Sequence, residues 1–176
     1  MGKMMWEYAN GIDNSEVESD YGNPKSISSS EVLPYNYTKL DEIYRELKKL
    51  SMETGRRLRD KKMYAPNVNI WVKFNDFSKI SKQVTLDNVI DNDEDIYNNA
   101  VKLFNKIWNN DNDKKVRGLC VGVSNLTDIY KVQLSIFGEE NIKIEKNDHL
   151  QKTIDDIKKK YGDKSITYAD ELKKKD

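Results

Sequence analysis

The stretch Val68-Asn69-Ile70-Trp71-Val72-Lys73-Phe74 decides the fold. Apolar residues occupy every second position, and a period of two predicts a strand with one buried face. A short turn at 75–78 leads into a second alternating segment at 79–86, whose other positions are mostly polar. The sequence thus predicts two consecutive strands joined by a tight turn, with an apolar face that other elements must cover.

Two amphipathic helices flank these strands. Thr38 and Asp41 have the spacing of a capping box, and the apolar residues behind them recur at three- and four-residue steps. This stripe predicts a helix of roughly twenty residues. Its members are Leu40, Ile43, Tyr44, Leu47, Leu50, Thr54 and Leu58. Asn92 or Asp93 caps a second predicted helix. The inward residues of that helix are Ile96, Ala100, Leu103, Phe104 and Ile107.

Two more strands complete the predicted domain, which spans residues 23–126. A serine-rich segment at 24–33 alternates weakly and ends at Pro34, and residues 116–124 are rich in Val and Leu. The order β-α-β-β-α-β predicts an α+β fold, with a four-stranded sheet and two helices on one of its faces.

The segments outside this domain lack such patterns. Residues 1–22 are polar and rich in turn formers, without a helical or strand period, and are predicted to be a linker. Residues 127–146 show only short extended pieces. Residues 147–176 form a C-terminal extension, in which a helix is predicted from Asn147 to Tyr161, with Gly162 as its stop signal.

The composition limits the class of protein. The chain has 176 residues, 37% hydrophobic and 34% charged, which is typical of a folded domain with a polar surface. No run approaches about eighteen apolar residues and no leader opens the chain, so we expect no membrane partner and a cytoplasmic location. The single cysteine, Cys120, agrees with a reducing compartment. Because the net charge is zero, any phosphate-binding surface must be local.

Positive charge is unevenly placed along the chain. The end of the first predicted helix carries Arg56, Arg57, Arg59, Lys61 and Lys62. Like charges packed this closely usually have an anionic partner. The uncovered face of the sheet would present Asn69, Lys73, Ser81, Gln83 and Thr85. Such a donor-rich face suits contact with phosphates without readout of bases. The third strand lacks the aromatic and glycine pattern of an RNA-recognition module, which shares this element order.

No catalytic or metal site is predicted. His149 is the only histidine and begins the C-terminal helix, while Cys120 lies within a strand, where a buried thiol is expected. The run Asp91–Asp95 resembles a calcium loop but is followed by Ile96 where that loop needs glycine, and is therefore predicted to cap a helix. A small enzyme of unrecognised type is an alternative, and it requires a pocket of perturbed titratable groups.

The assembled residues resemble the C-terminal part of Y-family translesion DNA polymerases, in particular the UmuC- and DinB-like polymerases (IV/V type) of Gram-positive bacteria. Residues 8–14 resemble the end of the thumb of that family, and Pro24-Lys25-Ser26-Ile27-Ser28 resembles the strand that opens its little-finger domain. The remaining landmarks follow in the family order at 57–59, 74–77, 84–86, 116–119 and 124–126. The resemblance covers about residues 6–126.

This resemblance implies that the domain grips the backbone of primer-template DNA with its open sheet. The matching positions are Lys25, Ser26, Ser28, Ser29, Lys79, Ser81, Lys82, Gln83 and Arg117. The palm and fingers of the family are not in this sequence, so the chain is expected to be a fragment that does not polymerise alone. It needs no cofactor of its own, because the Mg²⁺ of the parent polymerase would bind in the palm.

A second resemblance lies just beyond the domain, within the predicted linker at 127–146. Gln133-Leu134-Ser135-Ile136-Phe137 is similar to the peptide with which bacterial polymerases bind the sliding clamp (beta subunit). In an extended peptide, Leu134, Ile136 and Phe137 can enter apolar pockets while the amide of Gln133 binds at the rim. An edge strand buried against the domain is the structural alternative. The functional alternative to a DNA grip is a protein-interaction module that binds the clamp without affinity for DNA.

Overall fold

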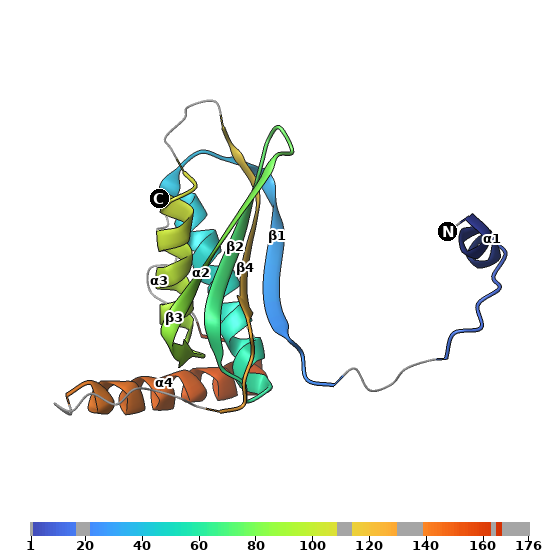
Figure 1. Cartoon of the computed structure of the whole chain (residues 1–176). Helices are drawn as coiled ribbons and strands as arrows, with labels where there is room; N and C mark the ends of the chain where they lie inside the picture. The colour runs from blue at the N-terminus through green and yellow to red at the C-terminus, as the bar shows by residue number, and fades with distance from the viewer. Residues whose placement is uncertain (1, 17–21, 109–113, 130–138, 163–164, 167–176) are drawn as a thin grey trace.

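The computed structural model describes residues 2–16, 22–108, 114–129, 139–162 and 165–166. Eight elements follow in the order α1 (Gly2–Ala9), β1 (Ser26–Tyr37), α2 (Leu40–Asp60), β2 (Ala65–Phe74), β3 (Lys79–Ile90), α3 (Asp93–Asn105), β4 (Val116–Ser124) and α4 (Glu139–Tyr161). From β1 to β4 this is the predicted β-α-β-β-α-β order. Figure 1 shows α2 and α3 side by side on one face of the sheet, so the predicted α+β fold is confirmed.

The sheet is antiparallel throughout and has the strand order β1-β4-β2-β3. The last strand in sequence, β4, therefore lies between β1 and β2. The first strand is at an edge, which explains why it continues through Pro34 to Tyr37 instead of ending before the proline as predicted. Proline is tolerated at a sheet edge because its missing N–H group faces no partner strand. An irregularity in the pairing of β1 with β4 lies between Val32 and Tyr37.

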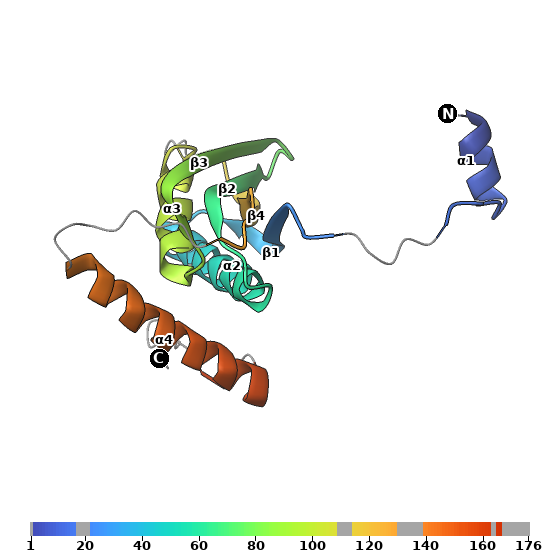
Figure 2. The ribbon, with the colours of Figure 1, turned by 60° about the horizontal axis from the view of Figure 1, so that its bottom comes forward.

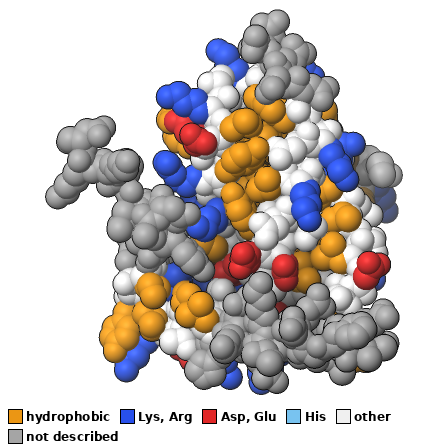
Figure 3. Space-filling view, turned by 90° about the vertical axis from the view of Figure 1, so that its left-hand side faces the viewer, with side chains coloured by type: hydrophobic (Ala, Val, Ile, Leu, Met, Phe, Trp, Pro, Cys, Tyr) orange, Lys and Arg blue, Asp and Glu red, His pale blue; other side chains and the backbone are white. Residues whose placement is uncertain are grey.

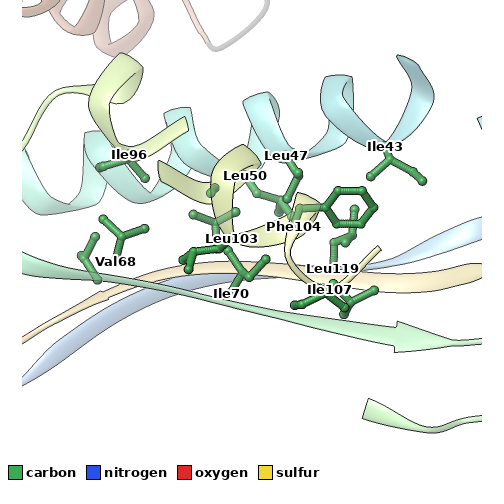
Figure 4. Packing of buried hydrophobic residues seen from close by; sticks show 14 of the residues in the cluster. Ile43, Leu47, Leu50, Val68, Ile70, Ile96, Leu103, Phe104, Ile107 and Leu119 are labelled. Atoms are coloured by element: carbon green, nitrogen blue, oxygen red, sulfur yellow. The ribbon is translucent and has the colours of Figure 1, made fainter. Parts of the chain in front are cut away.

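The hydrophobic core fills the layer between the sheet and the two helices. Figure 4 shows Leu47 of α2 and Phe104 of α3 directed toward β2 and β4, where Ile70 and Leu119 meet them. All four side chains are almost fully buried. The alternation at 68–74 places Val68, Ile70, Val72 and Phe74 in this core, as predicted. Burying a large aliphatic side chain contributes roughly 1.5–3 kcal/mol, so this layer holds the domain together.

Two helices lie outside this layer. The short helix α1 has no buried residue and stands apart from the sheet in Figure 1, in the segment that was predicted to be the end of a thumb and a linker without a helical period. Two turns of helix are too short to give a periodic signal. The helix α4 crosses one end of the domain, as Figures 1 and 2 show. It begins at Glu139 rather than at the predicted Asn147 and ends at Tyr161 as predicted, followed by Gly162 with a positive φ of 94°.

Of the two predicted helix caps, the one on α3 is confirmed and the one on α2 is wrong. Asn92 caps α3, because its side chain accepts a hydrogen bond from the backbone N–H of Asp95 at 2.7 Å. The capping box at Thr38 is wrong: the residue before α2 is Lys39, and no side chain caps the helix there. Asp41 and Glu42 still favour this start, because their charges complement the helix dipole.

Candidate nucleic-acid interface

The side of the sheet that faces away from α2 and α3 is called the open face here. Strand pairing arranges its side chains in four rows that run across all four strands. In order toward the β2–β3 turn these rows are Ser26/Ser124/Asn67/Thr85, Ser28/Gly122/Asn69/Gln83, Ser30/Cys120/Trp71/Ser81 and Val32/Gly118/Lys73/Lys79. Most members of these rows have side chains that can form hydrogen bonds. The charged members, Lys73 and Lys79, are both in the row nearest the β2–β3 turn.

The middle of the open face is shaped by the glycines of β4. A Cβ atom on Gly122 would lie 2.7 Å from Oδ1 of Asn69 and 3.0 Å from Cβ of Ser28, so only glycine lets these two side chains close over the strand. The ring of Trp71 lies beside Gly118, where a Cβ would meet it in ordinary van der Waals contact at 3.6 Å. The ammonium group of Lys79 lies 4.2 Å from the centroid of the Trp71 ring, an arrangement that places positive charge above the aromatic face.

Positive charge gathers where the β2–β3 turn meets β4, and we call this region the hairpin end. It comprises Lys73, Lys79 and Arg117 together with Phe77. Lys73 and Arg117 both approach the ring of Phe77, at 5.1 and 4.9 Å from its centroid. No carboxylate among the described residues is paired with these three cations by a salt bridge within 4 Å. From the side on which α3 lies, by contrast, basic and acidic side chains are interspersed, as Figure 3 shows.

Five of the predicted DNA-contact residues lie on the open face. They are Ser26, Ser28, Lys79, Ser81 and Gln83, and all are exposed. Lys25 is exposed just before β1. Arg117 falls in an irregularity of β4, since its neighbours Val116 and Gly118 pair with the adjacent residues Phe74 and Lys73. This irregularity directs Arg117 toward Phe77.

Two predicted contact residues are on the wrong side of the sheet. Ser29 is buried, with 8% of its surface exposed, because it alternates with Ser28 and shares the helix side with Ile27. Lys82 pairs with the core residue Ile70 and therefore also points to the helix side, although it is exposed at the sheet edge. The period-two alternation with Ile27, and with Ile80 and Val84, marks the helix side at these two positions, but both residues were proposed from the family resemblance and not from this alternation.

The prediction missed two aromatic residues of this surface. Trp71 was placed on the outward face by its alternation but was not proposed as a site residue, and Phe77 was treated only as part of a turn. Their proximity to Lys79, Lys73 and Arg117 depends on strand pairing, so only the alternation around Trp71 could have indicated a role.

Within the basic cluster at the end of α2, the largely buried member Arg59 has its anionic partners inside the protein. Arg59 donates two hydrogen bonds to the carboxylate of Asp155 on α4, at 2.6 and 3.0 Å, and one to Asp93 of α3 at 2.8 Å. Burial lowers the pKa of Arg59, but its hydrogen bonds to Asp155 and the charge of Asp93 outweigh burial, so the pKa lies above its ordinary value. Arg56 pairs with Glu53, and Arg57 donates to the backbone carbonyl of Ser28.

A glycine makes this arrangement possible. A Cβ on Gly55 of α2 would lie 2.2 Å from Oδ1 of Asp93, so the carboxylate could not approach any other residue there. Oδ2 of Asp93 accepts a hydrogen bond from the side chain of Gln151 on α4 at 2.6 Å. We call Arg59, Asp93, Gln151 and Asp155 the Arg59 junction. It joins α2, α3 and α4.

The described residues offer little for catalysis. A pocket of about 350 Å³ between α2, α3 and α4 contains Asp93, but both oxygens of this carboxylate are already hydrogen-bonded. Cys120 is buried, and burial raises the pKa of its thiol, which disfavours the reactive thiolate. Within the described part of the chain, no three acidic, histidine or cysteine side chains come together to hold a metal ion.

Three further sequence-based expectations concern His149, the peptide Gln133–Phe137 and membranes. The side chain of His149 and the whole peptide Gln133–Phe137 lie outside the described residues. As for membranes, none of the helices described has both the length and the apolar character needed to span one.

The comparisons with known proteins assign this arrangement to a family. Residues 24–136 match the model of the impB/mucB/samB family C-terminal domain. The chain belongs to this family. The impB/mucB/samB assignment confirms the resemblance to the C-terminal domain of Y-family polymerases that the sequence landmarks indicated.

Curated relatives of this family domain bear polymerase or repair names. The chain is 36% identical to DNA polymerase IV of Clostridium acetobutylicum over 99% of its own length and 43% of that protein. It is 33% identical to DNA polymerase IV of Oceanobacillus iheyensis, over 94% of its own length and 39% of that protein. It is 30% identical to the putative UV-damage repair protein UvrX of Bacillus subtilis, over 96% of its own length and 40% of that protein. The chain thus spans about two fifths of the length of these relatives.

Solved structures show the same fold. The insertion ternary complex of Dbh DNA polymerase matches with a TM-score of 0.52 and 20% identity, over 70% of this chain and 34% of that one. DinB from Sulfolobus solfataricus matches with a TM-score of 0.51 and 19% identity, over 70% and 35%. At this level of identity the match supports the little-finger architecture alone.

Proposed function

We propose that this domain grips the backbone of primer-template DNA with its open face, as part of an error-prone translesion DNA polymerase. The observation that carries this proposal is the segregation of charge on the sheet. The open face combines rows of hydrogen-bonding side chains with the cations of the hairpin end, which form no salt bridge to a described carboxylate, whereas Arg59, the largely buried member of the other large basic cluster, is neutralised within the protein by Asp93 and Asp155. Hydroxyl, amide and cationic groups position a duplex through its phosphates without reading its sequence.

The relatives support the polymerase part of this proposal by name. Since the chain covers about two fifths of their length, nucleotide transfer would depend on the segments of the relatives that it does not match. The domain would hold the DNA product, and the resulting contact would be sequence-independent and strongly salt-dependent.

Two neighbouring lysines of β3 provide a matched test of the open face. Lys79 and Lys82 are both exposed, lie three positions apart and occupy opposite faces of the sheet. In anisotropy titrations with primer-template DNA over a salt series, Lys79→Gln should reduce the slope of log K against log salt by about one. Lys82→Gln should leave the slope unchanged. Equal effects of both substitutions, or no binding at low salt, would show that the open face is not the DNA-binding surface.

We further propose that Gln133–Phe137 tethers the domain to the bacterial sliding clamp. The support is the sequence itself, in which three apolar residues and a glutamine amide have the spacing of a clamp-binding peptide. A tether of this kind would raise the local concentration of the domain at a primer end.

A pull-down with purified clamp tests this tether. Leu134→Ala/Phe137→Ala should abolish capture, because both apolar anchors are lost, while Ser135→Ala should retain it. Undiminished capture of the double variant would refute the tether. Clamp capture together with an absence of DNA binding would instead support the protein-interaction module.

A further inference from the structure

The turn of the β2–β3 hairpin places a phenylalanine in a backbone conformation that normally requires glycine. The N–H of Phe77 donates to the carbonyl of Phe74 at 3.0 Å, and the N–H of Phe74 donates to the carbonyl of Ser78 at 2.9 Å. This is a three-residue hairpin loop with a bulge at its last position. That position is left-handed, and Phe77 has a φ of 66°. Glycine is preferred there because a Cβ atom is disfavoured at positive φ.

The same turn is otherwise well built for its shape. The carboxylate of Asp76 accepts hydrogen bonds from the backbone N–H of Ser78 at 2.9 Å and from its hydroxyl at 2.6 Å. Aspartate in this role is a normal turn former. The strain is therefore confined to Phe77, and an unfavourable conformation that persists in a regular turn indicates a role for the side chain.

Phe77 contributes little to the core. Its side chain is 63% exposed, and its recorded ring contacts are with the cations Lys73 and Arg117. Lys73 belongs to the last row of the open face, so the ring stands at the end of that face, beyond the rows that the duplex would cover.

An exposed ring flanked by cations has a chemical preference among nucleic acids. Contact with the phosphates of a duplex requires only the cations. A base that has no pairing partner can in addition stack on the ring, and stacking combined with phosphate neutralisation is the usual means of holding single strands.

We propose that Phe77, Lys73 and Arg117 bind single-stranded DNA, with Phe77 stacking on an unpaired base and the two cations binding the flanking phosphates. The proposal rests on the proposed function, because it extends the grip of the open face from the duplex to the adjoining unpaired template.

The experiment compares two DNA probes that share one duplex, of which only one carries a 5′ single-stranded overhang. By fluorescence anisotropy at a fixed salt concentration, the full chain should bind the overhang probe about tenfold more tightly than the blunt one. Phe77→Gly should abolish this preference and leave binding to the blunt duplex within about twofold. Phe77→Trp keeps a stacking ring and should keep the preference.

The same variants separate function from folding. Because glycine relieves the strained conformation, Phe77→Gly should raise the Tm by a few degrees, on the order of 3 °C, while it weakens overhang binding. Retention of the overhang preference in Phe77→Gly, or a fall in its Tm, would overturn the proposal. If the wild type binds the blunt duplex without any preference for the overhang, this inference alone fails. If it binds neither probe, the proposed function fails.

Discussion

The hairpin end and the Arg59 junction are both groups of cations, yet they are satisfied in opposite ways. Arg59 is largely buried, and two carboxylates and a backbone carbonyl accept its hydrogen bonds. Lys73 and Arg117 at the hairpin end approach only an aromatic ring among the contacts recorded for them, and that ring is itself exposed. The first arrangement is complete within the protein, whereas the second leaves its positive charge available to an outside anion.

This difference shows that the density of charge along a sequence does not identify its partner. Arg56–Lys62 is the denser cluster, but Arg59 within it lies at the end of a core helix, where it packs against α3 and α4. The cations of the hairpin end are dispersed in sequence and converge only through strand pairing. The following predictions test this contrast, beginning with the largest expected effect.

Removal of Arg59 should cost the most stability. In Arg59→Met, the carboxylates of Asp93 and Asp155 lose their cationic partner while they remain mostly buried, and breaking such a buried pair costs roughly 3 kcal/mol. Urea denaturation measures the loss. The control is Arg57→Met, since Arg57 is exposed and its hydrogen-bond acceptor among the described residues is a backbone carbonyl. Similar losses in both variants would contradict the distinction between an internal and a surface cation.

Gly55→Ala should have the next largest effect. Alanine normally favours a helix over glycine by about 1 kcal/mol, but here its Cβ would lie 2.2 Å from the Asp93 carboxylate. The clash should reverse the sign and destabilise the domain by roughly 1–3 kcal/mol in the same denaturation experiment. The penalty should largely disappear when Gly55→Ala is introduced into a chain that already carries Asp93→Ala, because the carboxylate that clashes is then absent. A penalty that persists in the double variant would place its origin elsewhere.

The hairpin end should tolerate the loss of all its cations. Lys73→Gln/Lys79→Gln/Arg117→Gln should change the free energy of unfolding by no more than about 0.5 kcal/mol, because no carboxylate in the described part of the chain forms a salt bridge with these charges. The same variant should reduce the slope of log K for DNA binding against log salt by nearly three, because each of the three lost phosphate contacts contributes about 0.9 to that slope. A large loss of stability with an unchanged slope would reverse the assigned roles of the two regions.

The smallest expected effect is the pH dependence of the hairpin turn. Hydrogen bonds from the side chain and backbone of Ser78 lower the pKa of Asp76 below its ordinary value of 3.8. Because the pKa of the carboxyl is lowered in the folded state, its ionised form stabilises the turn at every pH above the ordinary pKa. This contribution is lost as the pH falls through the folded-state pKa. An NMR titration of the Asp76 carboxyl and the Ser78 amide should show both changing together below pH 3.8. Titration of Asp76 at its ordinary value would show that the turn does not depend on this carboxylate.

The sequence predicted those features that depend on local periodicity. The alternation at 68–74 and the apolar stripe ending at Leu58 located the core, and Asn92 was identified as a cap. The partners of Arg59 could not be predicted, since Asp93 and Asp155 lie 34 and 96 positions away and only tertiary packing joins them. Phe77 was equally inaccessible, because its conformation is a property of the turn and its cations come from two strands.

The position of β4 in the centre of the sheet has a consequence for the order of events during synthesis. Among the strands that the structure describes, β1 pairs only with β4, and the Tyr37–Val116 pair spans about 80 residues, so β1 lacks this partner until the ribosome has made β4. At about 5–20 residues per second, this interval lasts several seconds or longer. A strand that waits unpaired is at risk of aggregation, and that risk is low for polar segments. The serines at 26 and 28–30 are therefore expected to lower the risk that β1 aggregates before β4 emerges.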